Sequence, residues 1–110
     1  MPPKITIILI NYNYANFLAF AIQSILHQDY QNFECVIVDN SSTDGSVEVM
    51  RRFEGGDRRL RFLYLDRNLN QMGALLNVLD DVSGEYLSVI DADDFILRCY
   101  LSYHVQAHLM

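Results

Sequence analysis

The sequence has 110 residues, 51% of them hydrophobic, which is enough for one domain built around one core. Its formal net charge is −6, from 14 acidic and 8 basic residues, so we expect no nucleic-acid partner. No stretch approaches the roughly 18 apolar residues of a membrane span. Cys35 and Cys99 lie far apart in apolar stretches, which is typical of buried thiols in a reducing compartment and predicts a cytoplasmic domain.

The first predicted strand is the apolar run 5–10, which is rich in β-branched residues and typical of a strand covered on both faces. Three similar runs follow at 35–38, 60–65 and 86–90. Between the runs, apolar residues recur with helical spacing and predict three amphipathic helices. The predicted stripes are Phe17, Leu18, Ala21, Ile22, Ile25 and Leu26, then Val47, Met50 and Phe53, then Leu75, Leu76, Leu79 and Val82. Residues 41–44 are predicted to cap the second helix, and Gly84 is predicted to end the third.

Strands that alternate with helices through short connections predict an α/β fold. Because such crossovers are right-handed, we expect a Rossmann-like open, mostly parallel sheet flanked by helices, formed by residues 1–110 as one unit. The segment 95–110 is apolar on most sides of a helix and requires cover on more than one side. We therefore expect either a further part of a longer protein or a homo-oligomer formed through this segment.

Polar residues follow each predicted strand at the point where it ends, and in a parallel sheet these ends meet at one edge. Residues 11–14, 39–42 and 91–94 occupy these positions. Asp91, Asp93 and Asp94 place three carboxylates within four residues, a pattern that favours a bound cation. Oxygen ligands without cysteine or a nearby histidine suit Mg²⁺ or Mn²⁺, with phosphate oxygens completing the coordination.

The strand-end residues also carry a family resemblance. The segments are 7–14 (IILINYNY) with 17–18, then 21–28, 33–46 (FECVIVDNSSTDGS) and 84–94 (GEYLSVIDADD), in this order. Over essentially its whole length, the sequence resembles the N-terminal, nucleotide-sugar-binding half of a family 2 glycosyltransferase of the GT-A fold. The resemblance implies a transferase that binds a nucleotide-diphospho-sugar, with a UDP-sugar as the expected donor, and passes the sugar to an acceptor hydroxyl.

The resemblance also implies roles for individual residues. Tyr12 would stack on the base, and Asp39 would accept a hydrogen bond from the imide of uracil or another base. Asp91 would reach the ribose or the metal, and Asp93 would bind the Mn²⁺ or Mg²⁺ that bridges the diphosphate. The general base of the family lies in the acceptor half, beyond Met110, so no catalytic residue is expected here and these residues should bind better than they catalyse. Any membrane association would come from regions outside the sequence.

Some positions depart from the family pattern. Asn40 stands where a second aspartate is common, and leucine stands in the segment 70–77 where arginine is common, which leaves the base and one diphosphate contact open. Other interpretations of the site residues also stay open. The carboxylates at 91–94 could form a solvated turn or helix cap, Asp39 could cap a turn through Ser41 and Ser42, and Tyr12 could be a packing aromatic.

Two alternative functions remain to be weighed. One is a non-catalytic nucleotide-binding or assembly module of the same fold, which Leu76 and the apolar segment 95–110 favour. The other is a receiver-type phosphoacceptor, which also gathers aspartates at strand ends. A receiver needs an acidic pair after the first strand, where this sequence has Asn11 and Asn13.

Overall fold

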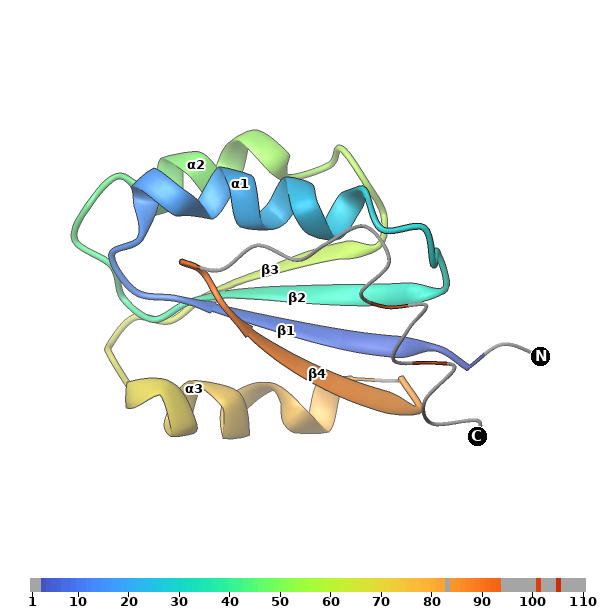
Figure 1. Ribbon diagram of the computed structural model, residues 1–110. Helices are drawn as coiled ribbons and strands as arrows, with labels where there is room; N and C mark the ends of the chain where they lie inside the picture. Colours follow the sequence, from blue (N-terminus) through green and yellow to red (C-terminus); the bar gives the residue numbers. More distant parts are fainter. Residues whose placement is uncertain (1–2, 83, 94–100, 102–104, 106–110) are drawn as a thin grey trace.

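The computed structural model describes residues 3–82, 84–93, 101 and 105, and its centre is one parallel sheet (Figure 1). The strands are β1 (Ile5–Asn11), β2 (Phe33–Asp39), β3 (Leu60–Tyr64) and β4 (Tyr86–Asp91). They lie in the order β3-β2-β1-β4, and each neighbouring pair is parallel. The predicted α/β fold with an open parallel sheet is therefore confirmed.

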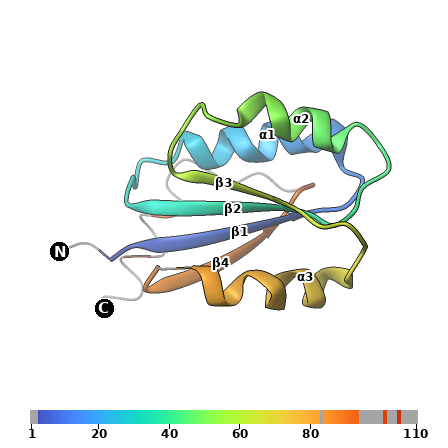
Figure 2. The same ribbon diagram turned by 180° about the vertical axis from the view of Figure 1, so that it is seen from behind.

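Helices cover both faces of this sheet. One face carries α1 (Ala15–Leu26) and α2 (Ser46–Phe53), and the other carries α3 (Asn70–Val78), which continues into the 3₁₀ turn η1 (Leu79–Asp81). The view from behind shows the same two layers (Figure 2). The chain moves outward from β1 through β2 to β3, then returns through α3 to β4 on the other side of β1. This reversal creates a topological switch point beside β1, where open α/β sheets bind ligands.

The buried residues of β1 alternate between two cores. Ile5, Ile7 and Leu9 pack toward α1 and α2, whereas Ile8 and Ile10 pack toward α3. Because every residue of β1 is buried, the prediction of a strand covered on both faces is confirmed there. The residue after Ile10 belongs, by the same alternation, to the α1 and α2 face, which later determines where polar side chains point.

The last strand differs from its prediction. The run 86–90 is predicted to be covered on both faces, but Leu87 is 48% exposed and Val89 is 40% exposed. The reason is the position of α3, which packs on β1 and β2 through Ala74 and Val78. Among the described residues, β4 is also an edge strand, and the alternating faces of such a strand need not both be covered.

Two helix predictions are partly wrong. The third stripe includes Leu76, which is 60% exposed, and omits Ala74 and Val78, which are the buried residues of α3. The first stripe is confirmed for its central residues, but Phe17 is exposed. Both errors arise because the direction from which the sheet approaches a helix selects which of several apolar residues is buried.

Gly84 does not end a helix, because α3 ends at Val78 and η1 ends at Asp81. Instead, its backbone lies against β1, and its N–H donates a hydrogen bond of 2.8 Å to Oγ1 of Thr6. A Cβ at this position would lie 2.3 Å from that oxygen and 2.5 Å from the backbone nitrogen of Thr6. Close approach of two backbones therefore explains the glycine.

The predicted terminal helix lies mostly outside the described residues. Leu101 and Val105 are described, and both are buried in the core beneath α1 and α2. The N–H of Leu101 donates a hydrogen bond of 3.0 Å to Oε1 of Gln28, which is itself buried. Part of this segment thus belongs to the core of the domain, and the predicted self-association stays a prediction.

The predicted burial of Cys35 is confirmed, and burial raises the pKa of its thiol well above the ordinary value. Cys99 lies outside the described residues. Within the described part of the chain, no helix combines the length and the apolar character that crossing a membrane requires.

Candidate functional site

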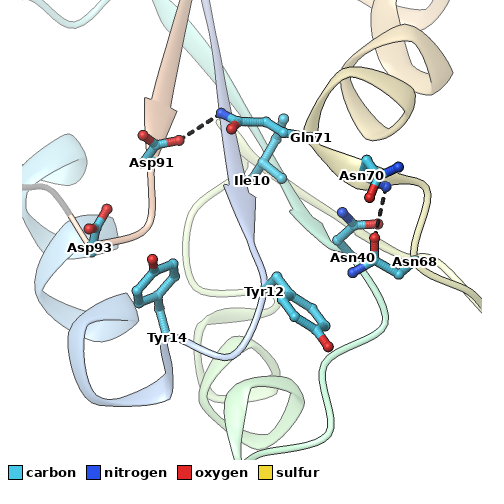
Figure 3. Close-up of a pocket in the computed structure, with 9 residues that line it drawn as sticks. All are labelled: Ile10, Tyr12, Tyr14, Asn40, Asn68, Asn70, Gln71, Asp91 and Asp93. Carbon is cyan, nitrogen blue, oxygen red and sulfur yellow. Dashed lines mark hydrogen bonds between the residues drawn. The ribbon is translucent and has the colours of Figure 1, made fainter.

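A cavity of about 360 Å³ lies at the carboxyl ends of β1, β2 and β4 (Figure 3). Ile10, the register partner of Asp91, forms part of its floor at the end of β1. The N-terminal end of α3 forms one wall, and the loop after β1 forms another. The cavity therefore occupies the switch point of the sheet, which is where the sequence predicts a ligand.

Two carboxylates enter this cavity together. Asp91 is the last residue of β4 and Asp93 follows two positions later, while Ala92 between them is fully buried in the core under α1. Because Ala92 points into the core, its neighbours point outward, and both carboxylates are exposed and line the cavity. Asp94, the third carboxylate of the predicted cluster, lies outside the described residues.

The chemistry of these two side chains suits a hard divalent cation. Mg²⁺ and Mn²⁺ are commonly held by one or two carboxylates, with phosphate oxygens and water as the other ligands. Within the described part of the chain, no group of three or more histidine, cysteine or acidic residues forms a complete protein cage. The residues present therefore fit a cation that is shared with a phosphate ligand.

Asp91 also accepts a hydrogen bond that the sequence analysis did not predict. Nε2 of Gln71, on the first turn of α3, donates to Oδ1 of Asp91 over 2.7 Å. Carboxamides from Asn40, Asn68, Asn70 and Gln71 line the cavity. None of the described residues that line it is lysine, arginine or histidine. Among these residues, a bound diphosphate would thus meet dipoles and carboxylates and no cationic side chain.

Tyr12 and Tyr14 extend from the loop after β1 into the same region. Tyr12 is 44% exposed, and both rings line the cavity. Asn13 between them has a φ of 60°, a left-handed conformation that asparagine tolerates better than most residues. Its N–H donates to Oγ of Ser42 over 3.0 Å, and its Oδ1 accepts from the N–H of Thr43 over 2.8 Å. The loop after β2 therefore holds both tyrosines in place.

Asp39 lies at the same rim but not in the cavity wall. It is 2% exposed and sits on the face of the sheet that α1 and α2 cover, whereas Asp91 points to the α3 face. Its carboxylate accepts hydrogen bonds from Nδ2 of Asn11 (3.0 Å), from Oγ of Ser42 (2.6 Å) and from the N–H of Ser42 (3.0 Å). The alternative interpretation, in which Asp39 caps a turn, is therefore observed through its hydrogen bonds with Ser42. The base contact implied for Asp39 stays a prediction.

The predicted carboxylates therefore share an edge but are separated by β1. Asp39 pairs in register with Asn11, and Asp91 pairs with Ile10 on the other side of the same strand. Two strand spacings place their backbones about 10 Å apart. The neighbour of Asp39, Asn40, is the residue of this loop that lines the cavity, and its Oδ1 accepts from the N–H of Leu69 over 2.9 Å.

Asp44 connects α1 and α2, the two helices on the face of the sheet opposite α3. Its carboxylate accepts from the N–H of Ala15 (3.1 Å), from the N–H of Ser46 (2.9 Å) and from Oγ of Ser46 (2.5 Å). Partial desolvation raises the pKa of Asp44, but the hydrogen bonds from Ser46 and Ala15 outweigh it, so that the pKa lies below its ordinary value. One side chain thus joins the first turns of α1 and α2.

An α/β sheet of this order, with an acidic and aromatic cavity at its switch point, has the architecture of GT-A glycosyltransferases. The sequence profile described as Glycosyl transferase family 2 matches residues 6–108, and the chain belongs to that family. The predicted resemblance is therefore confirmed. An uncharacterized glycosyltransferase of Haemophilus influenzae is 34% identical over 112 residues, covering 98% of this chain and 45% of the relative.

Solved structures agree with this assignment. A mannosyltransferase from Pyrobaculum calidifontis, in complex with GDP-Man and Mn²⁺, matches with a TM-score of 0.88 and 29% identity, covering 96% of this chain and 32% of the other. TarS of S. aureus, in complex with UDP-GlcNAc, matches with a TM-score of 0.82 and 27% identity, covering 94% and 30%. The chain thus spans less than half the length of each of these proteins.

Proposed function

We propose that the cavity binds the nucleoside diphosphate of a nucleotide-sugar donor together with Mn²⁺ or Mg²⁺. The observation that carries this proposal is the joint exposure of Asp91 and Asp93 in one cavity at the switch point of the sheet. Family membership supports the reaction class, because the family is that of the family 2 glycosyl transferases. For a longer protein that contains this domain, the proposed activity is transfer to an acceptor hydroxyl; for these residues it is donor binding.

Asp91 and Asp93 would hold the cation, with donor phosphates and water completing its coordination. When bound, the cation supplies Lewis-acid stabilisation of the negative charge that develops on the departing nucleoside diphosphate. The described cavity lining has no cationic side chain that could supply this charge instead. The Mn²⁺ found with GDP-Man in the Pyrobaculum structure supports the choice of metal.

The exposed ring of Tyr12 offers a stacking surface for the base, and Asn40 offers a polar contact beside it. Asp39 would support the base site from behind, because Oγ of Ser42 donates to Asp39 and accepts from the N–H of Asn13. We expect uridine as the base, which agrees with the UDP-GlcNAc complex of TarS. Guanosine is the alternative that the GDP-Man complex supplies.

Isothermal titration calorimetry with UDP and with GDP tests the proposal. We expect binding that needs Mn²⁺ or Mg²⁺, is lost on chelation with EDTA, and is weakened at least about tenfold by Asp93→Asn. Asp80→Asn is the matched control, since it removes an exposed carboxylate in η1 that is not part of the cavity lining. Tight binding that ignores both EDTA and Asp93→Asn would rule out the metal site.

A further inference from the structure

We propose that Gln71 is a positioning residue that orients Asp91 for the cation, an inference that rests on the metal site proposed above. Its Nε2 donates a hydrogen bond of 2.7 Å to Oδ1 of Asp91, and both side chains line the cavity (Figure 3). The two residues are 20 positions apart and come from different elements, α3 and β4. The bond therefore joins the two walls between which the cavity opens.

An exposed aspartate at the end of a strand rotates freely unless another group fixes it. Donation to Oδ1 fixes the plane of the Asp91 carboxylate and leaves Oδ2 for the cation. The donor is a neutral amide, which keeps the full negative charge of the carboxylate available. A lysine or arginine in its place would compete with the cation for that charge, and a glutamate would repel the carboxylate.

The other amide side chains that line the cavity hold Gln71 in place. Oδ1 of Asn40, which directly follows β2, accepts from the N–H of Leu69, and Oδ1 of Asn68 accepts from the N–H of Asn70 over 2.8 Å. Asn70 has a φ of 59°, so the chain turns sharply just before Gln71. These contacts fix the start of α3 relative to β2. The hydrogen bond from Gln71 to Asp91 then connects the start of α3 to the end of β4 across the cavity.

The competing explanation is that Gln71 only fastens α3 to the sheet. That role would change stability and would not act through Asp91. The two explanations differ in a measurable ratio, namely the UDP dissociation constant in EDTA divided by the constant in saturating Mn²⁺. This ratio reports the metal contribution alone, because a general loosening of the cavity changes both constants together.

We would measure this ratio by calorimetry for the wild type, Gln71→Leu and the matched variant Asn77→Leu, which removes an exposed amide from the same helix outside the cavity lining. We expect Gln71→Leu to lower the ratio by about tenfold or more, and Asn77→Leu to leave it unchanged. In an Asp91→Asn background, Gln71→Leu should have no further effect on the ratio, because it acts through that carboxylate. Circular dichroism establishes that each variant is folded.

The outcomes separate this inference from the proposed function. If wild type gains affinity from Mn²⁺ and Gln71→Leu gains the same within about twofold, the positioning role is overturned and the metal site stands. The positioning role is also overturned if Gln71→Leu lowers the ratio equally in the wild type and in the Asp91→Asn background. If wild type gains nothing from Mn²⁺ with either UDP or GDP, both the metal site and the role of Gln71 are rejected.

Discussion

Nδ2 of Asn11 donates a hydrogen bond of 3.0 Å to Oδ1 of Asp39, its register partner on the neighbouring strand. Ser42 gives the same carboxylate two further hydrogen bonds, one from its hydroxyl and one from its backbone N–H. Because Asp39 is buried and both of its oxygens already accept hydrogen bonds, we expect its influence on a ligand to pass through Ser42 to the loop that bears Tyr12.

We therefore expect Asp39→Asn and Ser42→Ala to behave alike. Each leaves a buried group without its partner, and each should lower the free energy of unfolding by about 1–3 kcal/mol. Each should also weaken UDP binding by a similar small factor. Urea unfolding and calorimetry measure the two effects. Should Asp39→Asn weaken binding more than about tenfold while Ser42→Ala leaves it intact, Asp39 contacts the base directly.

Tyr12 allows a test of base stacking. Base–aromatic stacking contributes about 1–3 kcal/mol, so Tyr12→Ala should weaken UDP binding by about tenfold, and UMP binding should fall by a similar factor. Tyr12→Phe keeps the ring and serves as the control, with little change expected. If Tyr12→Ala lowers only thermal stability and leaves both affinities as they were, the ring is a packing residue.

Gly84 and Gly45 form a matched pair of glycines. An added Cβ at Gly84 would lie 2.5 Å from a backbone nitrogen of β1, whereas an added Cβ at Gly45 would meet nothing within 4 Å. Gly84→Ala should therefore destabilise the domain by about 1–3 kcal/mol, because β1 is an inner strand, paired on both sides, and cannot shift easily. Gly45→Ala should change the unfolding free energy by less than about 0.5 kcal/mol. Equal effects of the two substitutions on the unfolding free energy would show that close approach to Thr6 is not the reason for the glycine.

The lowered pKa of Asp44 predicts that the stability of the domain depends on pH. Its pKa is lowered in the folded state, so the ionised carboxylate stabilises the fold at pH values above its ordinary pKa of 3.8, and this contribution is lost as the pH falls through the lowered value. Asp44→Asn should cost on the order of 1 kcal/mol at about pH 6. The difference from wild type should shrink as the pH falls below 3.8 and through the lowered pKa. A difference that stays constant as the pH is lowered would contradict the role of the charge.

Residues 5–10 illustrate how much of the fold the sequence could predict. A run of apolar, mostly β-branched residues favours a strand that is covered on both faces, and β1 is such a strand. Leu76 and Leu87 illustrate the limit. Both are apolar and correctly spaced, yet both are exposed, since α3 packs over β1 and β2 through other residues. Periodicity identifies which residues could be buried, and packing selects among them.

The candidate site divides in the same way. Tyr12, Asp91 and Asp93 line the cavity as their strand-end positions predict, because parallel strands bring their carboxyl ends to one edge. Asn40 is one of the strand-end polar residues that the sequence identifies, whereas Gln71 is not predicted as a site residue, although the asparagine-rich turn 68–70 that opens a helix was a signal for it. Amide side chains carry no charge pattern, so only their position identifies them as site residues.

The sequence by itself determined the α/β architecture, the family and the edge of the sheet where the cavity lies, because periodicity and strand-end chemistry are local properties of the chain. Only the tertiary structure decided which face of that edge each side chain occupies. Asp39 and Asp91 end parallel strands on either side of β1, but the alternation of side chains sends one under α1 and α2 and the other toward α3. A shift of one residue in either strand would have moved its aspartate to the opposite face. The register that prevents this shift is set by packing across the whole sheet.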